Sequence, residues 1–151
     1  MRRFDTIITG LTKIILTGFM SLMLILVFAQ VVFRYFIGLT PFFIEEVSRG
    51  LLIWVSFLGA SLALRASQHI GVEYFIGKLP ENARQPIKWI AQISVLIFLL
   101  FFLYASFRYS LNQTGQNSAT LPVSMFWFYF SLPMGALLMI LQQIFSFFQG
   151  E

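Results

Sequence analysis

The chain has 151 residues, of which 58% are hydrophobic, 11% are charged and 19 are phenylalanine. A soluble domain carries roughly 25% charged residues, so this composition excludes an ordinary soluble domain and predicts a multi-pass membrane protein. The absence of cysteine excludes disulfides and thiol chemistry, and one histidine is too few for a haem with two histidine ligands. The net charge of +4 comes from basic residues at the edges of apolar runs, which is typical of a membrane protein rather than of a nucleic-acid-binding one.

The first apolar run has no charged residue from Ile14 to Phe33 and lies between Lys13 and Arg34. As a helix, these twenty residues span about 30 Å, the thickness of a hydrocarbon core. A signal peptide has an apolar region of roughly 7–15 residues that ends at a cleavage site of small residues, and this run offers no convincing site. We therefore predict a retained membrane-spanning helix over about residues 12–36.

A second helix is predicted over about residues 41–67. Gly38 ends the first pattern, and Thr40-Pro41 supplies an N-cap followed by proline at the first helical position. The uncharged part, Gly50 to Leu64, has fifteen residues and spans only about 22 Å, which is short for a bilayer unless a flanking arginine snorkels or a protein covers the helix. Its small residues allow another helix to approach closely: Gly59, Ala60, Ser61 and Ala63.

Two further helices complete the predicted fold. Residues 68–86 mix charged and apolar side chains, which favours a short segment in the headgroup plane. A third helix over about 86–109 opens at Pro86, and a polar loop rich in turn formers occupies 110–120. A fourth helix over about 122–148 is expected to bend at Pro133, because proline removes a backbone hydrogen bond. We thus predict an all-α integral membrane protein in which residues 1–151 form a single four-helix domain.

The positive charges predict the orientation of these four helices. Cytoplasmic loops carry an excess of lysine and arginine. One side would hold seven basic residues and the other three, which places both termini and the 65–88 loop in the cytoplasm. The seven are Arg2, Arg3, Lys13, Arg65, Lys78, Arg84 and Lys88, and the three are Arg34, Arg49 and Arg108.

Most candidate functional residues are charged groups near the outer ends of the first two helices. Ionisable residues within a membrane span usually mark a partner or a pathway. These residues could therefore form an ion or proton site, but their position near the interface favours an ion-paired cluster that fixes the corner between the helices or docks a neighbouring protein. The cluster is Arg34, Glu45, Glu46 and Arg49.

A second group lies at the cytoplasmic interface: Arg65, His69 and Glu73. His69 as a pH sensor or proton relay would need a partner and a path through the bilayer, and neither is evident, so a structural role is favoured. The many aromatic residues of the third and fourth helices are interpreted as lipid-facing or gap-filling rather than as a ligand pocket. No phosphate-binding loop, nucleophile or metal-ligand spacing is present, so we expect no enzyme activity, no metal, no cofactor and no substrate site in this chain.

The order of motifs resembles a known family. An arginine ends the first helix (Arg34-Tyr35), followed by EEVSRGLLIWVSFLGASLALR at 45–65, HIGVE at 69–73, a Thr-Gly turn at 114–115 with Leu121-Pro122 after it, and SLPMG at 131–135. This order is similar to that of the small membrane subunit, the DctQ-like component, of tripartite ATP-independent periplasmic (TRAP) transporters. The resemblance covers nearly the whole length, with Glu73 where the family often has aspartate.

The resemblance implies a place in a larger machine. In this family a large multi-span membrane subunit carries the substrate and sodium sites and moves as an elevator, and a periplasmic binding protein delivers an organic acid such as a dicarboxylate or a sialic acid. The small subunit packs on the stationary scaffold of the large one in the bacterial inner membrane. On this basis the expected partner contacts are Trp54, Gly59, Ala60 and Ala63.

Two other functions remain open at this point. A small dimeric proton-coupled exporter would need a carboxylate near the middle of a span, whereas Glu45 and Glu46 lie near a helix start. A membrane anchor of a redox enzyme, such as a cytochrome b or quinone-binding subunit, would need more than the single histidine His69 to hold a haem.

Overall fold

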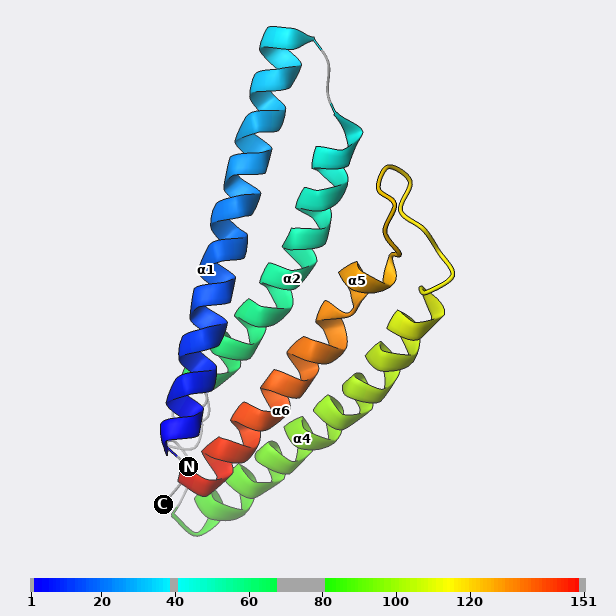
Figure 1. The fold of residues 1–151 in the computed structure, drawn as a ribbon. Helices are drawn as coiled ribbons and strands as arrows, with labels where there is room; N and C mark the ends of the chain where they lie inside the picture. Colours follow the sequence, from blue (N-terminus) through cyan, green and yellow to red (C-terminus); the bar gives the residue numbers. More distant parts are fainter. Residues whose placement is uncertain (1, 39–40, 68–80, 150–151) are drawn as a thin grey trace.

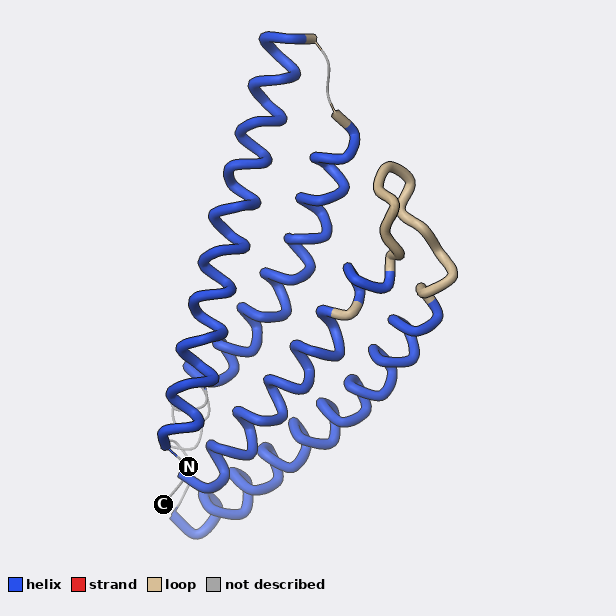
Figure 2. Tube along the Cα trace, in the orientation of Figure 1, coloured by secondary structure: helices blue, strands red, loops and turns tan. Residues whose placement is uncertain are grey.

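The computed structural model describes residues 2–38, 41–67 and 81–149, and the described residues are helical apart from the connections between helices. Figures 1 and 2 show long helices and one extended loop, which is tan in Figure 2. Four helices are long and apolar enough to cross a membrane by length and composition. The four-span, all-α fold expected from the sequence is therefore confirmed.

The first two helices run antiparallel and are joined at a glycine. Helix α1 covers Arg2–Val32 and continues as a π-helical turn, η1, over Phe33–Ile37. Gly38 then takes a φ of 73°, a left-handed conformation that glycine adopts without a steric penalty, and this ends the helix. Helix α2 covers Phe42–Ser67.

The second half of the chain contains α4 (Glu81–Asn112), the short α5 (Phe126–Tyr129) and α6 (Ser131–Gln149). Residues 113–125 form a loop in which the Ser118 backbone N–H donates to the Val123 carbonyl at 2.9 Å and the Met125 N–H to the Gln116 carbonyl at 2.9 Å. These paired bonds give the loop the form of a small hairpin. A polar loop was expected at 110–120, and the structure has an ordered loop at 113–125.

The helices lie side by side in the order α1, α2, α6, α4 (Figure 1). The main contacts between helices are those of α1 with α2, α2 with α6, and α6 with α4. Two ends of this layer are named by what they hold. The terminal end holds both chain termini, and the loop end holds η1 and the 113–125 loop (Figure 1). A chain with an even number of membrane spans has both termini at the same end, as here.

Because the helices form a layer, little of their surface is buried. The buried apolar side chains are Ile44, Leu58, Leu99, Ala136 and Ile140. None of the residues 14–33 of α1 is buried, whereas large side chains such as Leu24 and Phe28 are 73% and 70% exposed. In water such exposure would cost free energy roughly in proportion to the apolar area, so these surfaces belong against lipid or another membrane protein.

Two prolines lie differently from their expected positions. Pro86 is inside α4, which begins at Glu81 rather than at the proline. The expected bend at Pro133 appears as a break at Phe130, between α5 and α6, and Pro133 is then in the first turn of α6, where a missing N–H leaves no helical bond unmade. The segment expected in the headgroup plane falls largely on residues 68–80, outside the described residues.

Candidate functional site

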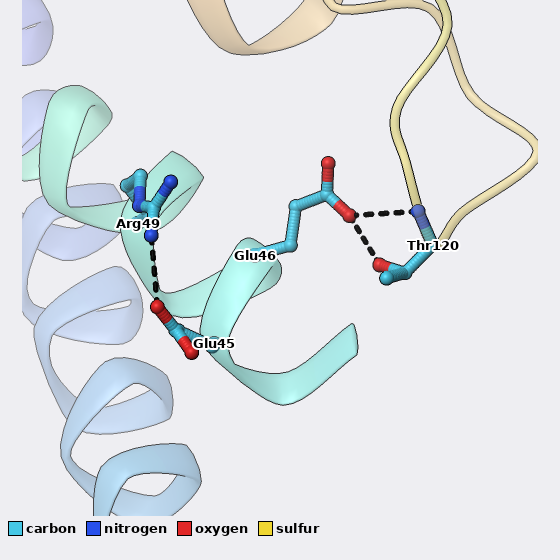
Figure 3. A network of polar contacts seen from close by, with 4 residues as sticks. All are labelled: Glu45, Glu46, Arg49 and Thr120. Atoms are coloured by element: carbon cyan, nitrogen blue, oxygen red, sulfur yellow. Dashed lines mark hydrogen bonds and ion pairs between the residues drawn. The ribbon is translucent and has the colours of Figure 1, made fainter. Parts of the chain in front are cut away.

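Two neighbouring carboxylates at the start of α2 have different partners. Arg49 donates from Nη2 to Glu45 Oε1 at 2.8 Å, an ion pair between residues four apart on one face of the helix (Figure 3). Both side chains are exposed, at 71% and 54%, so solvent screens the pair and it contributes little to stability. Of the expected cluster, Arg49 thus pairs with Glu45, and among the described residues it is not within ion-pairing distance of Glu46.

Glu46 instead holds the 113–125 loop. Its carboxylate accepts hydrogen bonds from the backbone N–H of Thr120 at 3.1 Å and from the Thr120 hydroxyl (Figure 3). It also accepts one from the backbone N–H of Ala119 at 3.2 Å. Ser118 supports the same turn, because its hydroxyl accepts from the Leu121 N–H at 3.0 Å. A residue of the second helix therefore fixes a loop that follows it by more than seventy positions.

A cavity of about 300 Å³ lies beside this junction at the loop end. It is bounded by α2, the loop and α5, and its described lining residues include Glu45, Arg49, Thr120, Phe128 and Tyr129. The mixture of exposed charge and aromatic surface is suited to contact with another protein. Among the described residues, no cluster of three or more histidines, aspartates and glutamates could hold a metal ion.

Arg34 does not join the other charges at the loop end. It lies in η1, is exposed, and makes no ion pair with Glu45 or Glu46 in the described part of the chain. The group expected from the sequence therefore divides into a separate arginine, an Arg49–Glu45 pair and a Glu46–loop anchor. None of these groups lies in the middle of a membrane span, where a transporter places its substrate or ion site.

Trp54 holds three elements of this chain together. Its indole Nε1 donates to the Trp127 carbonyl in α5 at 3.2 Å, and its ring packs edge-on against Phe19 of α1 with ring centroids 6.0 Å apart. The side chain is half-buried by these contacts. Trp54 therefore has a role inside the chain, whatever else contacts its exposed edge.

The small residues predicted as partner contacts lie open on α2. Ala60 and Ala63 are exposed, and a Cβ added at Gly59 would meet nothing within 4 Å. Ser61 differs from them, because it is fully buried and its hydroxyl donates to the Leu58 carbonyl at 2.7 Å. The face that carries Gly59, Ala60 and Ala63, here called the open α2 face, is thus not closely packed against any part of the chain that the structure describes.

Close helix contacts inside the chain use other glycines. A Cβ at Gly135 of α6 would lie 2.7 Å from the Cβ of Phe57, and a Cβ at Gly50 of α2 would lie 2.2 Å from the Phe128 ring. Neither glycine was singled out as a contact from the sequence. A glycine within an apolar helix was the available signal, but it cannot tell which glycine faces a neighbouring helix.

At the terminal end, Arg65 of α2 donates from Nη1 to the hydroxyl of Thr9 in α1. Thr9 is buried, although it lies near the start of the chain. The other two residues of the expected cytoplasmic group, His69 and Glu73, lie outside the described residues. The described geometry thus gives Arg65 a cross-helix role that the sequence did not reveal.

The comparison with protein families decides the classification. A family model described as "Tripartite ATP-independent periplasmic transporters, DctQ component" matches residues 23–150. The chain belongs to this family. The match covers α2, α4, α5 and α6 and the last part of α1, so the resemblance seen in the motif order is confirmed over most of the chain.

Individual relatives agree with the family. A putative TRAP transporter small permease protein of Haemophilus influenzae is 33% identical over 159 aligned positions, which cover 100% of this chain and 98% of the relative. The ectoine TRAP transporter small permease protein TeaB of Halomonas elongata is 30% identical over 94% of this chain and 75% of its own length. Both relatives are named as small permease proteins, which are transport subunits rather than enzymes.

A longer relative has a different architecture. The sialic acid TRAP transporter permease protein SiaT of Haemophilus influenzae is 26% identical over 107 residues, which cover 71% of this chain but only 17% of SiaT. A segment similar to this chain is therefore joined there to a much longer permease polypeptide. Within the DctQ family, a chain of this kind and a larger permease can be parts of one molecule.

Proposed function

We propose that this chain is the stationary small subunit of a binding-protein-dependent TRAP transporter in the bacterial inner membrane, and that it enlarges the scaffold of a separate large permease subunit. The observation that carries the proposal is the placement of charge. The described side chains of Glu45, Glu46, Arg49 and Arg65 lie at the two ends of a single helix, and the fifteen residues from Gly50 to Leu64 between them have no charge. A DctQ-family chain arranged in this way is suited to holding a partner rather than to moving an ion itself.

The partner in this proposal is the large permease, and the contact surface is the open α2 face. A helix with exposed small residues lets the backbone of a neighbouring helix come close, which favours van der Waals packing within a membrane. The fusion of a similar segment to a longer polypeptide in SiaT supports the association of the two parts. Trp54, the other predicted contact, lies on a different side of α2, where it meets Phe19 and Trp127, so a partner contact at its exposed edge would be separate from the open α2 face.

Substrate and coupling ion belong to the same proposal. The large subunit would carry a site for an organic acid of the dicarboxylate or sialic acid type, a sodium gradient would drive uptake, and a periplasmic protein would deliver the substrate. The relatives' names differ in substrate, so identity of the cargo follows from the partner proteins and not from this chain.

The contact surface is tested by co-purification with the large subunit in mild detergent. Ala60→Trp places a bulky ring on the open α2 face, where a partner backbone would approach, and should reduce recovery of the large subunit at least about tenfold, since one lost contact of 1.4 kcal/mol suffices for that factor. Trp54→Phe tests the other predicted contact, on a different side of α2; it removes the bond to Trp127 but keeps an aromatic ring.

Ala105→Trp is the matched control, because Ala105 is an exposed alanine on α4. Full recovery of the complex with Ala60→Trp would contradict the assignment of this face. Loss with Ala105→Trp alone would move the contact surface to α4.

Uptake in liposomes tests the function itself. The three components, which are this chain, the large permease and the periplasmic binding protein, should together give sodium-dependent uptake of the organic acid. Omission of this chain should abolish uptake, because the scaffold would be incomplete. Uptake by this chain alone would refute the scaffold function, and uptake unaffected by its omission would show that the subunit is dispensable.

A further inference from the structure

A second cavity lies at the terminal end, between α1 and α2, and has no part in the proposed function. Its volume is about 480 Å³, and its described lining residues are Thr6, Thr9, Gly10, Lys13, Leu62, Arg65 and Ala66. Two of these side chains are cationic and two carry hydroxyl groups, while none of the described lining residues is acidic. The described lining residues therefore carry positive charge and several hydrogen-bond donors.

The helix spacing explains why these groups meet. Thr6, Thr9 and Lys13 are three and four residues apart in turn, so they share one face of α1, and Leu62, Arg65 and Ala66 share one face of α2 in the same way. The bond from Arg65 to the Thr9 hydroxyl joins the two faces and holds the guanidinium at the cavity wall. Lys13 has no ion-pair partner among the described residues.

Gly10 lines the cavity without a side chain. It lies beside Thr9 on the lining of α1, and a Cβ built at this position would meet no atom within 4 Å. A larger residue at Gly10 would therefore extend into empty space rather than into another side chain. A larger side chain at Gly10 would therefore reduce the volume of the cavity.

The depth of the two cations matches that of a lipid headgroup. Lys13 immediately precedes the uncharged run of α1 that begins at Ile14, and Arg65 immediately follows the uncharged run of α2 that ends at Leu64. Both charges thus lie at one boundary of the apolar layer. Next to them on α1, Leu11 and Ile14 are 58% and 72% exposed and offer apolar surface to acyl chains.

We propose that this cavity binds the phosphate diester headgroup of an anionic phospholipid, with Lys13 and Arg65 as its cationic contacts and the threonine hydroxyls as further donors. A phosphate diester carries one negative charge and accepts several hydrogen bonds, which fits two cations and two hydroxyls. Basic pockets between transmembrane helices on the cytoplasmic side bind lipid headgroups of this kind. The bound lipid would fill the space between α1 and α2 and fix the two helices relative to each other.

Two simpler explanations of lipid binding must be distinguished from binding in the cavity. Basic residues at a membrane surface attract anionic lipids without any pocket, at about 1 kcal/mol per charge. The same cations would also attract free phosphate. If the first explanation holds, the loss of any cation at this end should weaken lipid binding equally. If the second holds, inorganic phosphate should bind as well as a phospholipid.

The test is a titration of the full-length chain, purified in mild detergent and stripped of lipid, with phosphatidylglycerol while native mass spectrometry counts the lipids retained. We expect one retained phosphatidylglycerol at low lipid concentration, no retained phosphatidylcholine, and no competition from inorganic phosphate at the same concentration. Lys13→Gln should weaken retention about tenfold, the effect of losing one charge-assisted hydrogen bond. Gly10→Leu should weaken it by a similar factor, because the leucine fills the cavity without changing the charge.

Each variant has a matched control. Lys88→Gln removes a cation of α4 that does not line the cavity, and Gly18→Leu adds the same side chain on α1 at a glycine that also has open space around it. Retention should stay unchanged in both. Because Arg65→Gln would also break the bond to Thr9, Lys13 and Gly10 decide the matter, and circular dichroism checks that all four variants keep their helices.

Three results would overturn the proposal. Equal losses in Lys13→Gln and Lys88→Gln would reduce the effect to general surface attraction. Equal retention of phosphatidylcholine, or full competition by inorganic phosphate, would show that the cavity does not recognise an anionic phospholipid. Unchanged binding in Gly10→Leu would show that the lipid does not enter the cavity.

Discussion

Glu45 and Glu46 illustrate how adjacent residues on one helix acquire separate roles. A helix turns by about 100° per residue, so the two carboxylates leave α2 in different directions. Glu45 faces Arg49 one turn later, in a solvent-screened pair, whereas Glu46 faces the loop and accepts bonds from Ala119 and Thr120. Charged acceptors make the stronger hydrogen bonds, so Glu46 is the residue that orders the loop end.

Glu46→Ala should release the 113–125 loop from α2. Without the carboxylate, the backbone N–H groups of Ala119 and Thr120 lose their acceptor, and their amide hydrogens should exchange with solvent about tenfold faster, the effect expected from the loss of a bond to a charged acceptor. Hydrogen–deuterium exchange followed by mass spectrometry measures this directly in the purified chain.

The control is Glu45→Ala, which removes a carboxylate of the same helix turn but leaves the loop contacts intact. Its exchange at residues 119 and 120 should match that of the unmodified chain. If both variants exchange equally fast, the loop is not held by Glu46.

At the level of whole helices, two glycines set the distance between α2 and its neighbours. Gly135 allows α6 to lie against Phe57, and Gly50 allows the Phe128 ring of α5 to lie against the α2 backbone. The same helix carries Gly59 on a face with nothing against it. Helix α2 thus has one side that is closely packed inside the chain and another on which a Cβ at Gly59 would meet no atom of the described residues within 4 Å.

Gly135→Ala should destabilise the chain, because the new Cβ would lie 2.7 Å from the Phe57 Cβ and 3.2 Å from its carbonyl oxygen, closer than atoms pack. Overpacking of this kind costs about 1–3 kcal/mol, and the melting temperature of the isolated chain in detergent should fall by several degrees, at the roughly 2–4 °C per kcal/mol typical of chains of this length.

Gly59→Ala is the control for Gly135→Ala, because it makes the same change on the other side of α2. It adds a methyl group where no atom lies within 4 Å, and alanine has the higher helix propensity. The isolated chain should therefore be as stable as before or more so. A larger loss at Gly59 than at Gly135 would reverse the assignment of the two sides of α2.

For the molecule as a whole, the arrangement in a layer matters more than any single contact. Four helices in a row, with their main contacts between neighbours along the row, leave most of the apolar surface of the described residues without a protein partner (Figure 1). A closed bundle would hide this surface. An open layer leaves it exposed, which agrees with the proposed role as part of the scaffold of a larger membrane assembly.

The amino-acid sequence determined the number of spans, the end of the first helix at Gly38, the four-residue spacing that lets Arg49 reach Glu45, and the family. Each of these depends on short-range information: uncharged run length, the left-handed freedom of glycine, the four-residue helix repeat and the local order of motifs. All four can be recognised in the sequence because each is a property of a short segment and does not depend on how the helices pack together.

Only the tertiary structure decided what depends on residues far apart in the chain. The bonds from the loop to Glu46, from Trp54 to Trp127 and from Arg65 to Thr9 join positions separated by 56 to 74 residues. The choice of Gly50 and Gly135 rather than Gly59 for close contact depends on the rotation of each helix about its axis. Composition cannot specify that rotation, because in an apolar helix every face has a similar hydropathy and the packing of neighbouring helices selects one.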